Sequence, residues 1–118
     1  MKKQNVIQEK SFKFAIEIIK LYKVLKSQHE YDLARQVLRS GTSIGANIEE
    51  SIAAQSKKDF LSKVSISLKE ARETNYWLRL LDVSELLPIE FSFLKNNSLE
   101  LITIMSSIVK TLKEQLKM

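Results

Sequence analysis

The sequence predicts an all-α protein, an antiparallel up-down-up-down four-helix bundle. The 118-residue chain has only two glycines and one proline, too few turn residues for a fold of many short strands. Apolar residues recur at helical spacing in four segments, at about 11–28, 31–55, 57–82 and 88–116. Because the turns between these segments are short, consecutive helices should be antiparallel neighbours in a single domain spanning residues 1–118.

The composition is that of a soluble domain with one core. Hydrophobic residues make up 44% of the chain and charged residues 28%, and there is no cysteine for a disulfide or a thiolate metal site. No apolar stretch is long enough to span a membrane, and no apolar run follows the N-terminal lysines, so we expect a cytoplasmic protein. The net charge of +5 permits an acidic partner such as nucleic acid.

The first predicted helix carries more apolar surface than a bundle needs. Ser11 is a plausible N-cap, and the core face includes Phe14 and Ile18. A flank of three further residues continues the apolar arc around one side. This flank is either a contact between subunits or a surface that the chain's own termini cover. It consists of Phe12, Ile16 and Ile19.

The second predicted helix contains both glycines of the chain. A glycine in a helix interior costs about 1 kcal/mol relative to alanine, so Gly41 and Gly45 need a structural reason. With Ser40 beside them, they would let a neighbouring backbone come unusually near. We therefore predict close helix packing at Ser40, Gly41 and Gly45.

A polar line runs along the same helix. Arg39, Ser43 and Glu50 share a face, and Asn47 lies between this face and the apolar stripe. In an antiparallel pair with the third helix, position 39 falls opposite about position 73, so Arg39 should pair with Glu73 or Glu70. Asn47 should meet a serine of the third helix. The predicted network comprises Arg39, Ser43, Asn47, Glu50, Ser67, Glu70 and Glu73, with Ser65 as the alternative to Ser67.

The remaining helix boundaries are indicated by local signals. Ser56 can cap the third helix by accepting from a backbone amide, and Asp59 can answer it. Pro88 fits the opening of the fourth helix. Lysines near the end of that helix complement the negative end of its dipole. They are Lys110, Lys113 and Lys117.

The sequence offers no catalytic machinery. There is no Glu-x-x-His motif for a carboxylate-bridged metal site, and no glycine-rich phosphate loop follows a strand. Glu49 and Glu50 are helix neighbours that diverge by about 100 degrees, so they make a poor acid pair. We expect no catalytic residue, no metal ligand, no cofactor and no enzymatic activity.

Three segments together resemble a four-helix-bundle family associated with 23S ribosomal RNA intervening sequences. The likeness covers nearly the whole chain, although Ser51 stands where the family usually has glycine. It implies a ring, commonly a homopentamer, and a relation to accessory proteins of diversity-generating retroelements, which are thought to bind nucleic acid. It implies no enzymatic activity. The segments are R-S-x-x-S-I-x-x-N-I-x-E at Arg39 to Glu50, S-x-x-D-F at Ser56 to Phe60 and S-L-x-E at Ser67 to Glu70.

Two functions remain open at this point. The assembled protein could bind RNA or DNA by reading phosphate, because five-fold repetition multiplies a modest basic patch. It could instead be a scaffold or adaptor for another protein, through the apolar flank and Trp77. We expect Trp77 to pack within the bundle or between copies. The candidate phosphate contacts are Lys13, Lys20, Lys23, Lys57, Lys58, Lys63, Arg72 and Arg79.

Overall fold

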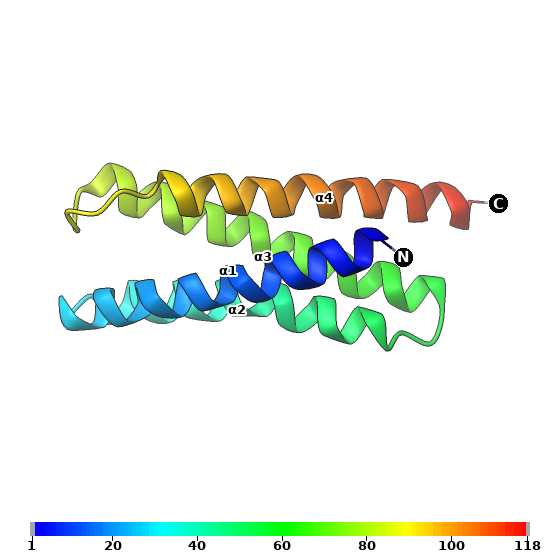
Figure 1. Ribbon diagram of the computed structural model, residues 1–118, viewed down its shortest axis with the longest axis horizontal. Coiled ribbons are helices and arrows are strands. Elements are labelled where there is room, and N and C mark those ends of the chain that lie inside the picture. Colours follow the sequence, from blue (N-terminus) through cyan, green and yellow to red (C-terminus); the bar gives the residue numbers. More distant parts are fainter. Residues whose placement is uncertain (1, 118) are drawn as a thin grey trace.

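The fold is all-helical, as predicted. The computed structural model describes residues 2–117, with side chains from Val6 onward, and this part of the chain contains four helices and no strand. The helices form a rod with principal extents of 50 × 22 × 21 Å. They are α1 (Lys2–Ser27), α2 (Tyr31–Ile52), α3 (Lys57–Ser84) and α4 (Ser92–Leu116), drawn in Figure 1.

The chain passes back and forth along the rod. Figure 1 shows α1 running from right to left, α2 returning, and α3 and α4 repeating this path. Each helix packs against the next, and α1 also touches α4. Between α2 and α3, Arg39 meets Glu73 while Glu50 lies 3.2 Å from Lys63, so the paired residue numbers run in opposite directions. All four helices therefore surround one core.

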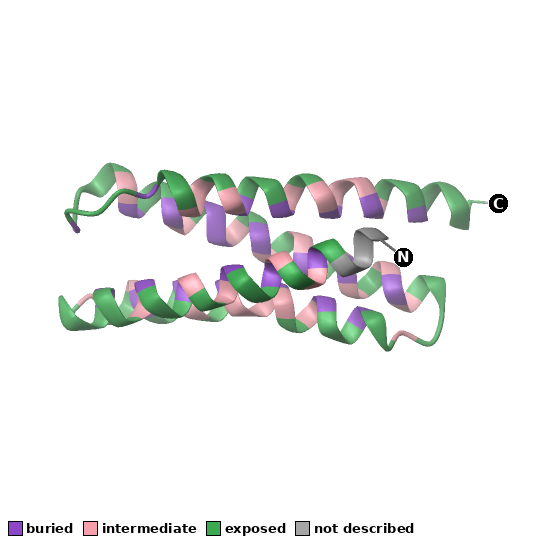
Figure 2. Ribbon diagram, viewed as in Figure 1, coloured by how far each residue is buried: buried purple, intermediate pink, exposed green. Residues whose placement is uncertain are grey.

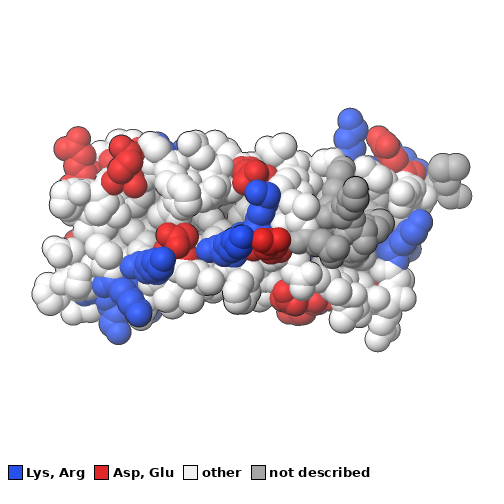
Figure 3. Space-filling view, viewed as in Figure 1, with Lys and Arg blue, Asp and Glu red and all other residues white. Residues whose placement is uncertain are grey.

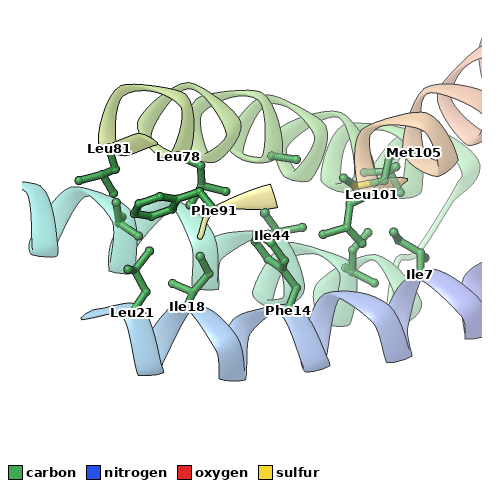
Figure 4. Close-up of a cluster of buried hydrophobic side chains, with 14 of the residues drawn as sticks. Ile7, Phe14, Ile18, Leu21, Ile44, Leu78, Leu81, Phe91, Leu101 and Met105 are labelled. Atoms are coloured by element: carbon green, nitrogen blue, oxygen red, sulfur yellow. The ribbon is translucent and has the colours of Figure 1, made fainter. Parts of the chain in front are cut away.

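The core is built from residues three and four apart on each helix. In Figure 2 the buried positions of α4 face the other helices, and the outward positions are exposed. Ile18, Leu25, Ile44 and Leu78 are completely shielded from solvent. The close-up in Figure 4 shows side chains from α1, α3 and α4 converging in this core. Burial of one apolar stripe per helix is the main stabilising force in such a bundle.

The first helix starts earlier than the sequence analysis predicted. It begins at Lys2, and Ser11 is fully buried in mid-helix, where its hydroxyl donates to the Gln8 carbonyl at 3.2 Å. The prediction of Ser11 as an N-cap is therefore wrong. Ile7, which is only 1% exposed, continues the buried stripe towards the N-terminus. Its contribution to the core stabilises the additional turns.

The connection between α3 and α4 also differs from the prediction. Pro88 lies in a loop, and α4 begins only at Ser92. Glu85 ends α3 in the left-handed region with φ of 56°. Phe91 is the N-cap residue of α4, and Glu90 before it binds the first helical residue, because its Oε1 accepts from Ser92 Oγ at 2.6 Å and from the Ser92 amide at 2.9 Å. These hydrogen bonds lower the pKa of the Glu90 carboxyl. Phe91 stays outside the helix and is buried.

The predicted cap of α3 is confirmed. The Asp59 amide donates to Ser56 Oγ at 3.0 Å, and Asp59 Oδ2 accepts from the Gln55 amide at 3.2 Å. The preceding helix α2 ends at Ile52, three residues before the predicted end at Gln55. Among residues 2–117, none of the helices combines the length and apolarity that crossing a membrane requires.

Candidate functional site

Arg39 forms the centre of a polar cluster between α2 and α3. Its Nη1 donates to both carboxylate oxygens of Glu70, at 3.3 and 3.4 Å, and its Nη2 donates to Glu73 Oε2. The indole Nε1 of Trp77 donates to the same Glu73 oxygen at 3.0 Å. Arg39 thus pairs with both glutamates, where the sequence analysis predicted a pair with one or the other.

Arg39, Glu70 and Glu73 form an electrostatic clip that links α2 to α3. The side chains of Arg39, Glu70 and Glu73 are 50%, 18% and 34% exposed. Without Arg39, the two carboxylates would repel each other on one face of α3. Its two acids outnumber its one cation. It is therefore unsuited to binding phosphate.

A double-mutant cycle should measure this clip. We expect Arg39→Met to couple with Glu70→Gln and with Glu73→Gln by about 0.5–1 kcal/mol each, because half of the Arg39 side chain is in water. Urea denaturation of single and double variants gives the coupling energies. The exposed Arg35–Asp32 pair of α2 is the control and should couple by at most about 0.5 kcal/mol. If Arg39 couples with neither glutamate, the cluster does not stabilise the contact between α2 and α3.

Ser43 and Asn47 of the polar line bond within their own helix, whereas Glu50 pairs with Lys63 of α3. Ser43 Oγ donates to the Arg39 carbonyl at 2.6 Å, and Asn47 Nδ2 donates to the Ser43 carbonyl at 2.9 Å. The prediction that Asn47 pairs with a serine of α3 is therefore wrong. Ser67 instead donates to the Ile44 carbonyl at 2.8 Å and links α3 to α2 directly. A carbonyl one turn back competes well for a short polar side chain.

The glycines of α2 face α1. A Cβ added to Gly41 would lie 2.7 Å from Cγ2 of Ile18, and one added to Gly45 would lie 3.4 Å from the Ser11 carbonyl oxygen. The close approach is thus to α1 and occurs at Gly41, whereas at Gly45 an added methyl would make only ordinary contact. Ser40 is fully buried and points to α3, where its Oγ lies 2.9 Å from Thr74 Oγ1.

Several of the candidate phosphate contacts already interact with neighbouring side chains. Arg79 donates to Asn75 at 3.0 Å and lies over the Tyr76 ring. Figure 3, which has α1 and α4 in front, shows cations and acids interspersed on this face. Three lysines form ion pairs: Lys13 with Glu9 at 2.8 Å, Lys20 with Glu17 at 3.0 Å and Lys63 with Glu50 at 3.2 Å.

The other candidate cations are exposed but dispersed. Lys23, Lys57, Lys58 and Arg72 form no ion pair with any described side chain. Lys23 lies in α1, whereas Lys57 and Lys58 form the first turn of α3. Arg72 lines a groove with three lysines that the sequence analysis assigned only to the end of α4. Their spacing of three and four residues, which places them on one helix face, was the available signal. They are Lys110, Lys113 and Lys117.

The predicted subunit flank of α1 is open to solvent. Phe12 is 64% exposed, and Ile16 and Ile19 are each 41% exposed. The described part of the chain, up to residue 117, does not fold its termini over this flank. Trp77 lies elsewhere. It packs against the core from α3 and meets the Tyr76 ring edge-on, with centroids 5.3 Å apart.

No metal site is evident in the described region. Over residues 2–117, no three histidine or carboxylate side chains are placed to share a metal ion. The single histidine, His29, contacts the Tyr31 hydroxyl through Nδ1 at 2.9 Å. The geometry therefore offers binding surfaces and an electrostatic clip.

Comparison with known proteins confirms the resemblance noted in the sequence. The family model described as 23S rRNA-intervening sequence protein matches residues 3–109. The chain is also similar to a crystal structure from Bacteroides thetaiotaomicron, described as a protein with unknown function from the S23 ribosomal protein family. The two share 47% identity with a TM-score of 0.86, over 92% of this chain and 98% of that chain. No curated protein matches the chain.

Proposed function

The chain belongs to the family of 23S rRNA-intervening sequence proteins, and from this premise we propose that it is a non-enzymatic, antiparallel up-down-up-down building block. Copies of it assemble into a homo-oligomeric ring, with five subunits as the expected number. The ring binds RNA or other nucleic acid through basic residues repeated around it. The net charge of +5 supports this choice of partner.

The observation that carries the proposal is the apolar flank of α1. A bundle helix needs one apolar stripe for its own core, and α1 already supplies one through Phe14 and Ile18. The exposed Phe12, Ile16 and Ile19 therefore form a second stripe with no role inside the subunit. Contact with another copy would remove this surface from water, at about 25 cal/mol per Å² of apolar area. If that contact joins different faces of two subunits and relates them by a closing rotation, repetition gives a ring.

Replacing flank residues should dissociate the assembly. We expect the double variant Phe12→Ser/Ile16→Ser to shift from oligomer to monomer, because the buried apolar area of each contact shrinks. Light scattering at several micromolar concentrations gives the mass. Val83→Ser is the matched control, since Val83 is 81% exposed near the end of α3, away from the flank. A monomeric wild type, or a double variant of unchanged mass, would contradict this assembly.

Nucleic-acid binding has its own test. Phosphate contacts release counterions, so the affinity of the protein for RNA should fall steeply as salt increases. Fluorescence anisotropy with a labelled single-stranded RNA and a labelled hairpin at several salt concentrations measures this dependence. Failure of both RNAs to bind saturably at low ionic strength would remove this part of the proposal.

A second candidate function is that of a scaffold or adaptor for another protein. A groove of about 370 Å³ between α1 and α4 favours it, because the exposed ring of Phe93 and the side chain of Ile16 line it. The Lys10–Glu100 ion pair, at 3.2 Å, lies at this groove. A pull-down with RNase treatment separates the two functions. Protein partners that survive RNase favour the adaptor, whereas partners lost with the RNA favour nucleic-acid binding.

A further inference from the structure

A basic groove between α3 and α4 carries four cations that form no ion pair within the described residues. It has a volume of about 430 Å³ and is lined by Arg72 of α3 and by Lys110 and Lys113 of α4, with Lys117 just beyond that helix. All four side chains are exposed. None of them forms an ion pair with a described side chain, and Glu114 is the one acid in the lining.

We infer that this groove binds the phosphate backbone of a nucleic-acid strand. The inference rests on the proposed function and specifies where the strand lies. The strand would then contact the groove and not the α1 lysines, because Lys13 and Lys20 are paired with neighbouring glutamates. Competing carboxylates lower the attraction of such lysines for phosphate, whereas the groove cations face only one acid.

The spacing of the groove lysines suits a chain of phosphates. Lys110 and Lys113 lie on one face of α4, and Lys117 continues this row directly after the helix with helical backbone angles. Because a helix rises about 1.5 Å per residue, the row extends over roughly 10 Å. A nucleic-acid strand carries a phosphate about every 3.4 Å of helix axis. At that spacing the row extends over about three phosphate intervals.

The floor of the groove supports extended basic side chains. Leu68 of α3 and Val109 of α4 are half-buried and line it. Lysine and arginine can lay their methylene stems along such apolar surface and keep the charged ends in water. This arrangement holds several cations near one another and lowers the entropy lost on binding.

Compensation of the helix dipole accounts for only part of this charge. The C-terminal end of a helix is equivalent to about half a negative unit charge. The three lysines of the row, even with Glu114 subtracted, exceed that amount. A surplus of positive charge therefore remains for a ligand.

A pair of charge-matched variants tests the groove. The first is Arg72→Gln/Lys110→Gln/Lys113→Gln, and the second removes the same charge from α1. RNA affinity is measured by anisotropy with a labelled single-stranded RNA and a labelled hairpin. Light scattering and thermal unfolding verify mass and folding. The second variant is Lys13→Gln/Lys20→Gln/Lys23→Gln.

We expect the groove variant to bind RNA about tenfold more weakly at low salt, with the slope of log affinity against log salt reduced by about 2. The α1 variant should keep nearly the affinity and slope of the wild type. If the wild type binds RNA and the groove variant binds it equally well, the strand does not bind in the groove, but the proposed function stands. Equal weakening in both variants also overturns the groove, because net charge alone would then explain binding. If the wild type shows no saturable RNA binding, both the proposed nucleic-acid function and binding in the groove are contradicted.

Discussion

Phe91→Ala is expected to lower the free energy of unfolding by about 3–5 kcal/mol, because it removes a buried aromatic ring and leaves a cavity. Phe91 is only 1% exposed although it lies in the loop before α4. Figure 4 shows its ring in the buried cluster near Leu78 and Leu81 of α3. The ring fastens the α3–α4 connection to the core. Urea denaturation at a fixed protein concentration measures the loss.

Phe93→Ala is the matched control for this variant. Phe93 lies two residues further along, is 63% exposed and is the same residue type, so its truncation should change stability by no more than about 0.5 kcal/mol. If both variants lose the same stability, burial of Phe91 does not hold the loop in place. Keeping the protein concentration constant prevents a change in assembly from being counted as a change in folding.

Gly41→Ala is expected to destabilise the protein even though alanine favours helices. The new methyl group would lie 2.7 and 2.8 Å from Cγ2 and Cγ1 of Ile18, which is fully buried. Ile18 is branched at Cβ and cannot swing aside freely. Overpacking costs about 1–3 kcal/mol, and the gain of about 1 kcal/mol in helix propensity offsets only part of this cost. Thermal and urea unfolding should therefore show a net loss.

Gly45→Ala provides the comparison four residues later on the same helix. The added methyl would lie 3.4 Å from the Ser11 carbonyl oxygen, which is ordinary contact, so stability should stay the same or rise by up to about 1 kcal/mol. Ile18→Ala should also cost less in the Gly41→Ala background than in the wild type, since it removes the clashing atoms. Equal effects of the two glycine variants would argue against close packing at Gly41.

The positions that the sequence predicted well are those controlled by local chemistry or helical periodicity. The cap formed by Ser56 and Asp59 depends on residues three apart, and the structure contains it. The register of two helices joined by a short turn places Arg39 opposite Glu70 and Glu73, where both contacts occur. Such relations need only the geometry of one turn and one helix pair.

The predictions that failed depended on competition between local and distant contacts. Ser11 has the chemistry of a cap, but Ile7 extends the buried stripe past it and the helix continues. Asn47 could have reached α3, yet a carbonyl on its own helix was nearer. Pro88 suits a helix start, but the chain stays a loop until Ser92. Phe91, in this loop, is buried in the core. A single sequence does not reveal which of two feasible partners is closer.

The sequence by itself determined four amphipathic helices, the need for close packing at Gly41 and the absence of recognisable catalytic motifs. Only the tertiary structure decided which neighbour each surface meets. It turned Gly41 towards Ile18 of α1 and Ser40 towards Thr74 of α3. It also placed Arg72 in one groove with the lysines of α4. Helical periodicity specifies which residues share a face, whereas the partner of that face depends on how all four helices pack together.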